Sequence, residues 1–80
     1  MRFRYDPESD ALYIQLSEGQ VDETLPVTEG YYLDIDKEGR VLGAEFLSVE
    51  EFKEWAAQRG VGVELPDHIE DPNAYRLNLA

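Results

Sequence analysis

The sequence predicts an α+β fold: a small antiparallel β-meander of four to five strands, one C-terminal helix packed on one face of the sheet, and an extended tail. Two observations predict this fold. Hydrophobic and polar residues alternate along the first part of the chain, as in half-buried strands, and turn-forming residues separate the alternating runs. The hydrophobic period then lengthens to that of an amphipathic helix. The 80 residues fit a single domain, 1–80, with the sheet in 1–47, the helix in 48–60 and the tail in 61–80.

Turn-forming residues separate the predicted strands. Pro7 and the acids around it favour a turn after the first strand, and Gly39 supplies the conformational freedom for a tight turn before the last one. Pro26 has no amide hydrogen to donate to a neighbouring strand, so we expect its strand to be irregular and to lie at an edge. In the last strand, Leu42, Ala44 and Phe46 are expected on one face. The predicted strands are residues 2–5, 11–16, 21–28, 31–36 and 41–47.

The helix has recognisable start and stop signals. Ser48 and Glu51 form a capping box, in which the Ser hydroxyl accepts from a free amide of the first turn, and Gly60 is a typical C-terminal stop. The stripe of the helix that should face the sheet consists of Val49, Phe52, Trp55 and Ala56. Two alternating runs in the tail each predict a short strand, added to this sheet or to that of a neighbouring copy: Val61, Val63 and Leu65, and Tyr75, Leu77 and Leu79.

Composition restricts the classes of partner. Eighteen acidic residues against seven basic ones give a formal net charge of −11, which repels nucleic acids and anionic membranes and attracts a basic protein. A chain this short buries only roughly two-thirds of its unfolded surface and has a thin margin of stability, so we also expect a homo-oligomer, most simply a dimer. Cysteine is absent, which excludes disulfides and thiolate metal sites. The opening residues are not those of a signal peptide, and no apolar run is long enough to span a membrane, so we expect a cytoplasmic protein.

The sharpest chemical pattern is the segment from Asp34 to Glu45. Its acids Asp34, Asp36, Glu38 and Glu45 stand at positions 1, 3, 5 and 12, with Gly39 at position 6, which is the order of an EF-hand calcium loop. The residues before the loop contain Pro and Gly and lack a helical stripe, so the entering helix is missing. A hairpin explains the same residues, and calcium binding remains the alternative hypothesis.

Nothing in the sequence predicts a catalytic residue or a cofactor. His68 is the only histidine, and a triad would need a serine beside it, whereas Ser9, Ser17 and Ser48 occupy turn or capping positions. We therefore expect a non-catalytic protein. An accessory subunit of an enzyme is a further alternative that no particular residue supports.

The face of the sheet that the helix leaves uncovered gives the best functional clue. Tyr13 and Tyr32 alternate with the Leu and Ile residues of their strands, and Val41 and Leu47 are expected on the same side. A cluster of exposed apolar residues indicates an interface. The expected interface residues are therefore Tyr13, Tyr32, Val41 and Leu47, in contact with a second copy or with another protein.

The run from Tyr5 to Ile14, Tyr-Asp-Pro-Glu-Ser-Asp-Ala-Leu-Tyr-Ile, resembles the opening of a family of short prokaryotic proteins. The similarity continues through Tyr32-Leu-Asp-Ile-Asp36, Gly39-Arg-Val-Leu-Gly43 and Ala44-Glu-Phe-Leu47, in the same order. The family is catalogued as domain of unknown function twenty-two eighty-three. The resemblance implies no activity or catalytic residues. Some members resemble the partner half of toxin–antitoxin-like gene pairs, which makes an antitoxin-like role a hypothesis for this chain.

Overall fold

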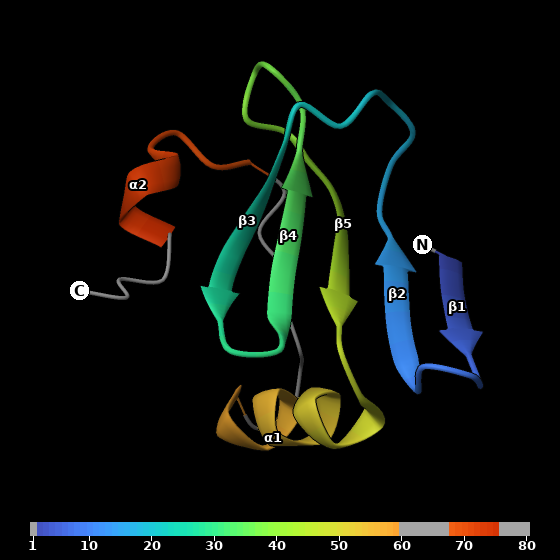
Figure 1. Cartoon of the computed structure of the whole chain (residues 1–80). Helices are drawn as coiled ribbons and strands as arrows, with labels where there is room; N and C mark the ends of the chain where they lie inside the picture. The colour runs from blue at the N-terminus through green and yellow to red at the C-terminus, as the bar shows by residue number, and fades with distance from the viewer. Residues whose placement is uncertain (1, 60–67, 76–80) are drawn as a thin grey trace.

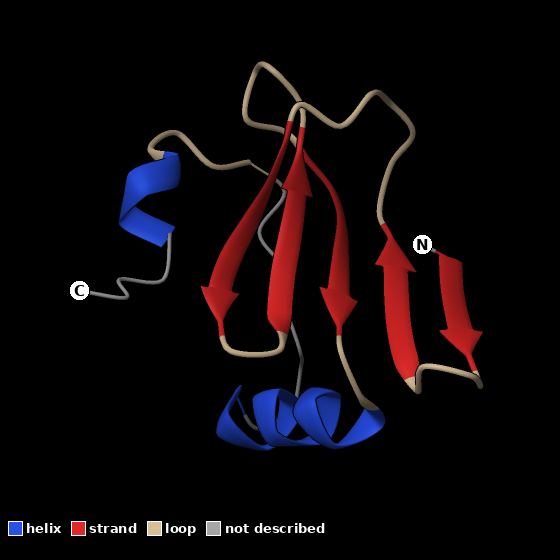
Figure 2. Ribbon diagram, in the orientation of Figure 1, coloured by secondary structure: helices blue, strands red, loops and turns tan. Residues whose placement is uncertain are grey.

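The computed structural model describes residues 2–59 and 68–75. Its five strands form one antiparallel sheet in the order β1-β2-β5-β4-β3, with α1 lying across one end of the strands and α2 beside β3 (Figures 1 and 2). The strands are β1 (Arg2–Asp6), β2 (Ala11–Gln15), β3 (Glu23–Thr28), β4 (Tyr31–Ile35) and β5 (Val41–Phe46), and the helices are α1 (Val49–Arg59) and α2 (Pro72–Tyr75). The predicted α+β fold class, with one antiparallel sheet and a helix packed on it, is confirmed.

The strand order departs from a simple meander at one place. β1 and β2 form a hairpin and β3, β4 and β5 follow one another, but β5 pairs with β2, so that β3 lies at the far edge. The chain between β2 and β3 crosses the ends of β5 and β4 to reach that edge (Figure 1). Pro26 lies in β3, and the edge position predicted for its strand is confirmed because an edge strand tolerates a missing amide donor.

The hydrophobic core lies on one face of the sheet, where α1 contributes Trp55 and the tail contributes Ile69. Phe46 is at its centre: its ring stacks on Tyr31 at 4.8 Å and contacts Trp55 at 5.1 Å and Phe52 at 5.2 Å between ring centroids. Aromatic pairs at these distances add to the gain from burial. The buried core cluster consists of Ile14, Leu25, Tyr31, Leu33, Ile35, Val41, Ala44, Phe46, Trp55 and Ile69.

Val41 lies in this core and not on the opposite face, where the alternation placed it. The register shifts between Asp34 and Ile35, so that Asp34 is opposite Gly43 while Ile35 is opposite Val41. Such a bulge inserts one residue and reverses which residues of the strand face inward. Val41 is consequently 2% exposed and belongs to the core cluster with Ala44 and Phe46. Leu42, expected beside Ala44 and Phe46, is buried outside that cluster.

The N-terminus of α1 is capped from two places. The Ser48 hydroxyl accepts from the Glu51 amide at 3.1 Å, which confirms the predicted capping position. A second acceptor is Asp10, whose carboxylate accepts from the Val49 amide at 3.3 Å and from the Tyr5 hydroxyl at 2.6 Å. Asp10 has a φ of 62°, a left-handed conformation that Asp tolerates better than most residues. The turn between β1 and β2 is thereby tied to the start of α1.

The described part of the tail is attached to the turn between β4 and β5. The Ile69 amide donates to the Gly39 carbonyl at 2.7 Å, and the Ile69 side chain is buried in the core. Residues 72–75 form the short helix α2, which was not predicted, so Tyr75 ends a helix and does not begin a strand. The expected strand of Val61, Val63 and Leu65 lies outside the described residues, as do Leu77 and Leu79.

Candidate functional site

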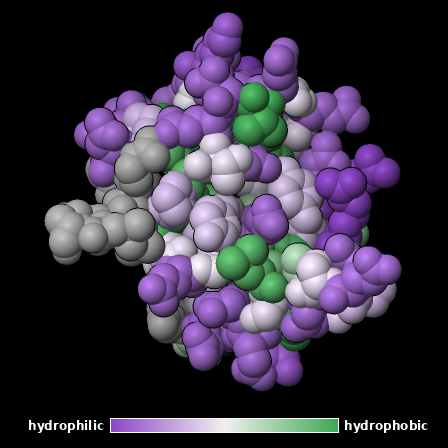
Figure 3. Space-filling view, viewed as in Figure 1, coloured by the Kyte–Doolittle hydropathy of each residue, from purple (hydrophilic) through white to green (hydrophobic). Residues whose placement is uncertain are grey.

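The outer face, defined as the sheet face opposite the core cluster, carries a row of side chains that crosses all five strands. Arg4 is paired with Tyr13, Tyr13 with Glu45, Glu45 with Tyr32, and Tyr32 with Pro26. Each member of this cross-strand row is half-buried or exposed, in contrast to the residues of the core face. Over the strands the molecular surface is of intermediate hydropathy with small hydrophobic areas, and its rim is hydrophilic (Figure 3).

Tyr13 is fixed in place by the neighbouring strands. Its side chain lies over Gly43 of β5, where any Cβ would collide with the Tyr13 hydroxyl. The hydroxyl donates to the Asp34 carboxylate at 3.0 Å, and the other oxygen of Asp34 accepts from the Thr24 hydroxyl at 2.6 Å. A hydrogen bond to a carboxylate is stronger than one between neutral groups. The missing side chain at Gly43 therefore lets Tyr13 reach across β5 to Asp34.

This environment changes the acidity of Tyr13. Burial, followed by the hydrogen bond to Asp34 and the charge of that carboxylate, raises the pKa of Tyr13 to about 12. On its other side, the Arg4 guanidinium lies 5.1 Å from the centre of the Tyr13 ring, within the range of a cation–π contact. Tyr13 is therefore a neutral, oriented aromatic ring at physiological pH.

Glu45 occupies the middle of the cross-strand row. Directly opposed residues on antiparallel strands have Cβ atoms about 4.5–5.5 Å apart, so both Tyr13 and Tyr32 flank the Glu45 side chain. Among residues 2–59 and 68–75 no ion pair or hydrogen bond to the Glu45 carboxylate is seen. A shallow hollow of about 480 Å³ adjoins it, lined in part by Tyr13, Ala11 and Pro7. The row thus presents the carboxylate of a half-buried residue, Glu45, between two tyrosines.

Three of the four residues expected at the interface lie where a partner can reach them. Tyr13 and Tyr32 are in the cross-strand row, and Leu47, 46% exposed, directly follows β5. Val41 is in the core. Glu45 was missed as a member of this surface, although its alternation with Ala44 and Phe46 carries the signal. Gly43, buried beneath the Tyr13 side chain, was missed as the residue that makes room for Tyr13.

The residues of the calcium alternative do not gather. Asp34 and Glu45 lie within strands, and Asp34 is engaged with Tyr13 and Thr24. Asp36 shapes the β4–β5 turn by accepting from the Glu38 and Arg40 amides, each at 2.9 Å. The segment before the loop forms strands β3 and β4, so the helix–loop–helix geometry of an EF-hand is not present there. No group of three metal-ligating side chains occurs in the described parts of the chain.

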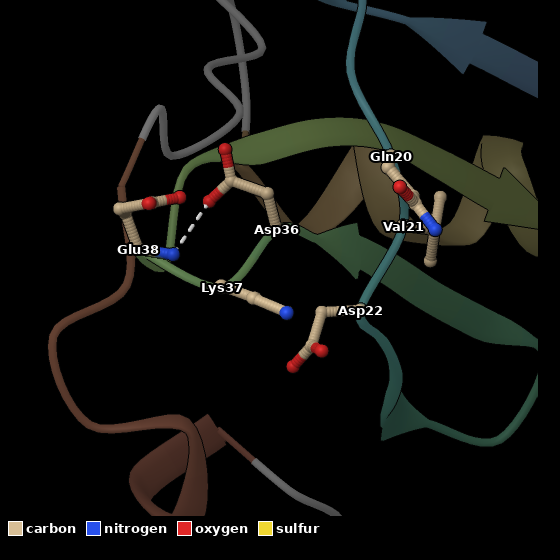
Figure 4. A pocket seen from close by; sticks show the side chains of 6 residues that line it. All are labelled: Gln20, Val21, Asp22, Asp36, Lys37 and Glu38. Atoms are coloured by element: carbon tan, nitrogen blue, oxygen red, sulfur yellow. Dashed lines mark hydrogen bonds between the residues drawn. The ribbon is translucent and has the colours of Figure 1, made fainter.

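A second hollow, of about 260 Å³, lies between this turn and the loop that leads into β3 (Figure 4). Lys37 and Asp22 extend toward each other across it, and Asp36 turns toward the backbone of Glu38. His68 is exposed nearby, and its Nε2 donates to the Glu38 carbonyl at 2.8 Å. Asp36 and His68 therefore serve to hold the turn and the tail together.

The acidic residues Asp6 and Asp10, at the turn between β1 and β2, also have structural roles. Asp6 accepts from the Glu8 amide and the Ser9 hydroxyl, each at 3.0 Å, and Asp10 connects Tyr5 to α1. These bonds account for the Tyr-Asp-Pro-Glu-Ser-Asp run as a hairpin turn anchored on the helix.

The fold and the cross-strand row define a small α+β domain in which a helix packs against the core side of the sheet and the other face is turned outward. The chain belongs to the family described as a protein of unknown function, DUF2283, whose model matches residues 2–49. The match spans all five strands and reaches the first residue of α1. Comparison with curated proteins and with solved structures found no match. In the described residues no helix has the length and apolarity to cross a membrane.

Proposed function

We propose that this protein is a non-catalytic, cytoplasmic protein-interaction module whose outer face binds a basic protein. The observation that carries the proposal is the position of Glu45, a half-buried residue between Tyr13 and Tyr32 whose carboxylate has no ion pair in the described residues. A carboxylate in such a position gains most from a cation supplied by a partner.

The cross-strand row is suited to a Lys or Arg side chain. A partner guanidinium at Glu45 gains a charge-assisted hydrogen bond and, at the same time, contact with a tyrosine ring. Arg4 already makes the second kind of contact with Tyr13 from within the chain. Pro26, at the β3 end of the row, and Leu47, which directly follows β5, add apolar area.

The charge of the chain supports the same kind of partner. A net charge of −11 raises the rate at which a basic protein meets this surface and makes that rate sensitive to salt. A toxin-like protein, in an antitoxin-like pair, is the partner that the family resemblance suggests.

The probe for this proposal is the protein encoded by the adjacent gene, titrated against the chain by calorimetry at low and at high salt. We expect binding that weakens with salt. Glu45→Gln should weaken it by roughly 10- to 100-fold, the loss of one hydrogen bond to a charged group. Glu54→Gln, which removes the same charge from an exposed position of α1, is the matched control and should leave binding nearly unchanged.

Absence of binding at low salt would refute the proposal for that partner. Equal losses in the Glu45→Gln and Glu54→Gln variants would show that only the net charge matters and that the outer face is not the binding surface.

A further inference from the structure

Strand β1 ends the sheet, and only one of its edges is paired. It bonds to β2, and within the described residues nothing pairs with its other edge. All five residues of β1 are exposed, unlike those of every other strand. An open edge of this kind is a template for a further strand.

The exposed side chains of β1 include two aromatic residues on the core side of the sheet. Phe3 is opposite Ile14 and Tyr5 is opposite Leu12, so both rings point to the face that carries the core. They are nevertheless 60% and 52% exposed, because α1 packs against β2 and β5. The core face therefore continues into an uncovered aromatic surface at this edge.

We infer that β1 pairs with β1 of a second copy, antiparallel, about a twofold axis at Arg4. This register places Phe3 opposite Tyr5 of the second copy and Arg2 opposite Asp6 of the second copy, and the axis repeats both pairs. The aromatic pairs lie on the core side and the ion pairs on the outer side, and both kinds of cross-strand pair are stabilising. The two sheets become one continuous sheet.

Two other positions of the twofold axis give less favourable cross-strand pairs. An axis at Phe3 sets Arg2 opposite Arg4 of the second copy, a like-charge pair. An axis at Tyr5 sets Phe3 opposite Pro7, which lies beyond the strand and has no amide hydrogen. With the axis at Arg4, the two Arg4 side chains face each other, but each guanidinium lies over its own Tyr13 ring.

Charge also favours this edge for self-association. Two copies of a chain with a net charge of −11 repel each other over most of their surface. β1 carries Arg2 and Arg4 against Asp6 alone, so the contact is made where the local charge is not acidic. A two-strand contact lies at the small end of protein interfaces, and we expect dissociation constants of about 1–100 μM.

Sedimentation equilibrium over a range of concentrations tests the self-association. The mass should rise from the 9.2 kDa of the chain to twice that value as concentration increases. Phe3→Glu should keep the protein at the monomer mass at every concentration. Val21→Glu, which makes the same change at an exposed apolar residue far from β1, should not. A monomeric wild-type protein, or a dimer that survives Phe3→Glu, overturns the inference.

The register is tested by cross-linking, because the chain has no cysteine of its own. Only a residue on the twofold axis lies opposite the same residue of the second copy. Arg4→Cys should therefore form a disulfide-linked dimer on mild oxidation, since opposed residues are about 4.5–5.5 Å apart between Cα atoms and disulfides span about 4.4–6.8 Å. Arg2→Cys should react about tenfold more slowly or less readily still, because residue 2 lies opposite Asp6 of the second copy and the two introduced thiols are then farther apart than a disulfide spans. Faster or equal reaction of Arg2→Cys refutes the register.

This self-association does not depend on Glu45 or Tyr32. Its failure leaves the binding of a basic partner by the outer face untouched, and a failure of Glu45→Gln to weaken that binding leaves the dimer untouched.

Discussion

Replacement of Gly43 by Ala tests how the outer face is built. A Cβ on Gly43 would lie 2.6 Å from the Tyr13 ring carbon that carries the hydroxyl, and closer still to the hydroxyl itself. Tyr13 must then move away, and its hydrogen bond to Asp34 is lost.

The magnitude follows from three contributions. Forcing an extra methyl group into a packed site costs about 1–3 kcal/mol. Losing a hydrogen bond to a carboxylate costs about 1.5–3 kcal/mol when the carboxylate is left unsatisfied. The cost is smaller here because Thr24 still donates to Asp34. Removing a glycine from a strand returns about 0.5–1 kcal/mol. The free energy of unfolding should therefore fall by about 2 kcal/mol, which lowers Tm by roughly 8–16 °C in a domain of this size.

Urea unfolding followed by the fluorescence of Trp55, the only tryptophan, measures this loss. The matched control is Gly43→Ala in a Tyr13→Ala background, where the collision with the Tyr13 ring and hydroxyl is gone, while the approach to the Ile14 carbonyl oxygen, at 3.0 Å, remains. The coupling energy between the two substitutions should be at least about 1 kcal/mol. A Gly43→Ala protein within about 0.5 kcal/mol of the wild type, or a cost that is the same in both backgrounds, would refute the described packing of Tyr13 over Gly43.

Three further outcomes are expected. Asp10→Gly should lower the free energy of unfolding by about 1–2 kcal/mol through the lost bonds to Tyr5 and Val49, and Asp10→Ala by roughly 1 kcal/mol more because of its φ of 62°; a larger loss for the glycine variant in urea unfolding would contradict this. The folded state raises the pKa of Tyr13 to about 12, so the stability that its protonated form contributes is complete below about pH 10, the usual tyrosine value, and is lost as the pH rises toward 12. Tyr13→Phe should weaken this alkaline loss, and an unchanged pH profile of urea midpoints would count against it. Calcium at about 1 mM should leave Tm unchanged, since Asp34 and Asp36 are engaged in hydrogen bonds within the sheet and its turn, whereas a rise in Tm would restore the calcium alternative.

The strands and α1 were predictable because each rests on a local signal. Alternation places the strands, Pro26 requires an edge, and Ser48 marks the helix start, and the structure has all three. The pairing of β5 with β2 was not predictable, since no local pattern distinguishes it from a simple meander. The same limit applies to α2, which is too short to show a hydrophobic period.

The candidate site was predictable only in part. Tyr13 and Tyr32 follow from a period of two, but Val41 does not, because the bulge between Asp34 and Ile35 reverses the direction of its side chain and leaves no mark in the residue types. The contact of Tyr13 with Asp34 across Gly43 joins three strands, and only the register reveals it. The similarity to the EF-hand order arises because a tight acidic turn and a calcium loop both favour Asp and Gly at nearby positions.

The most direct test of the proposed recognition surface is chemical-shift mapping of the ¹⁵N-labelled chain during titration with the protein from the adjacent gene. Recognition by the outer face predicts that the largest changes fall on Tyr13, Tyr32 and Glu45, at the centre of the sheet. Changes confined to the solvent side of α1, with those three amides unmoved, would contradict it.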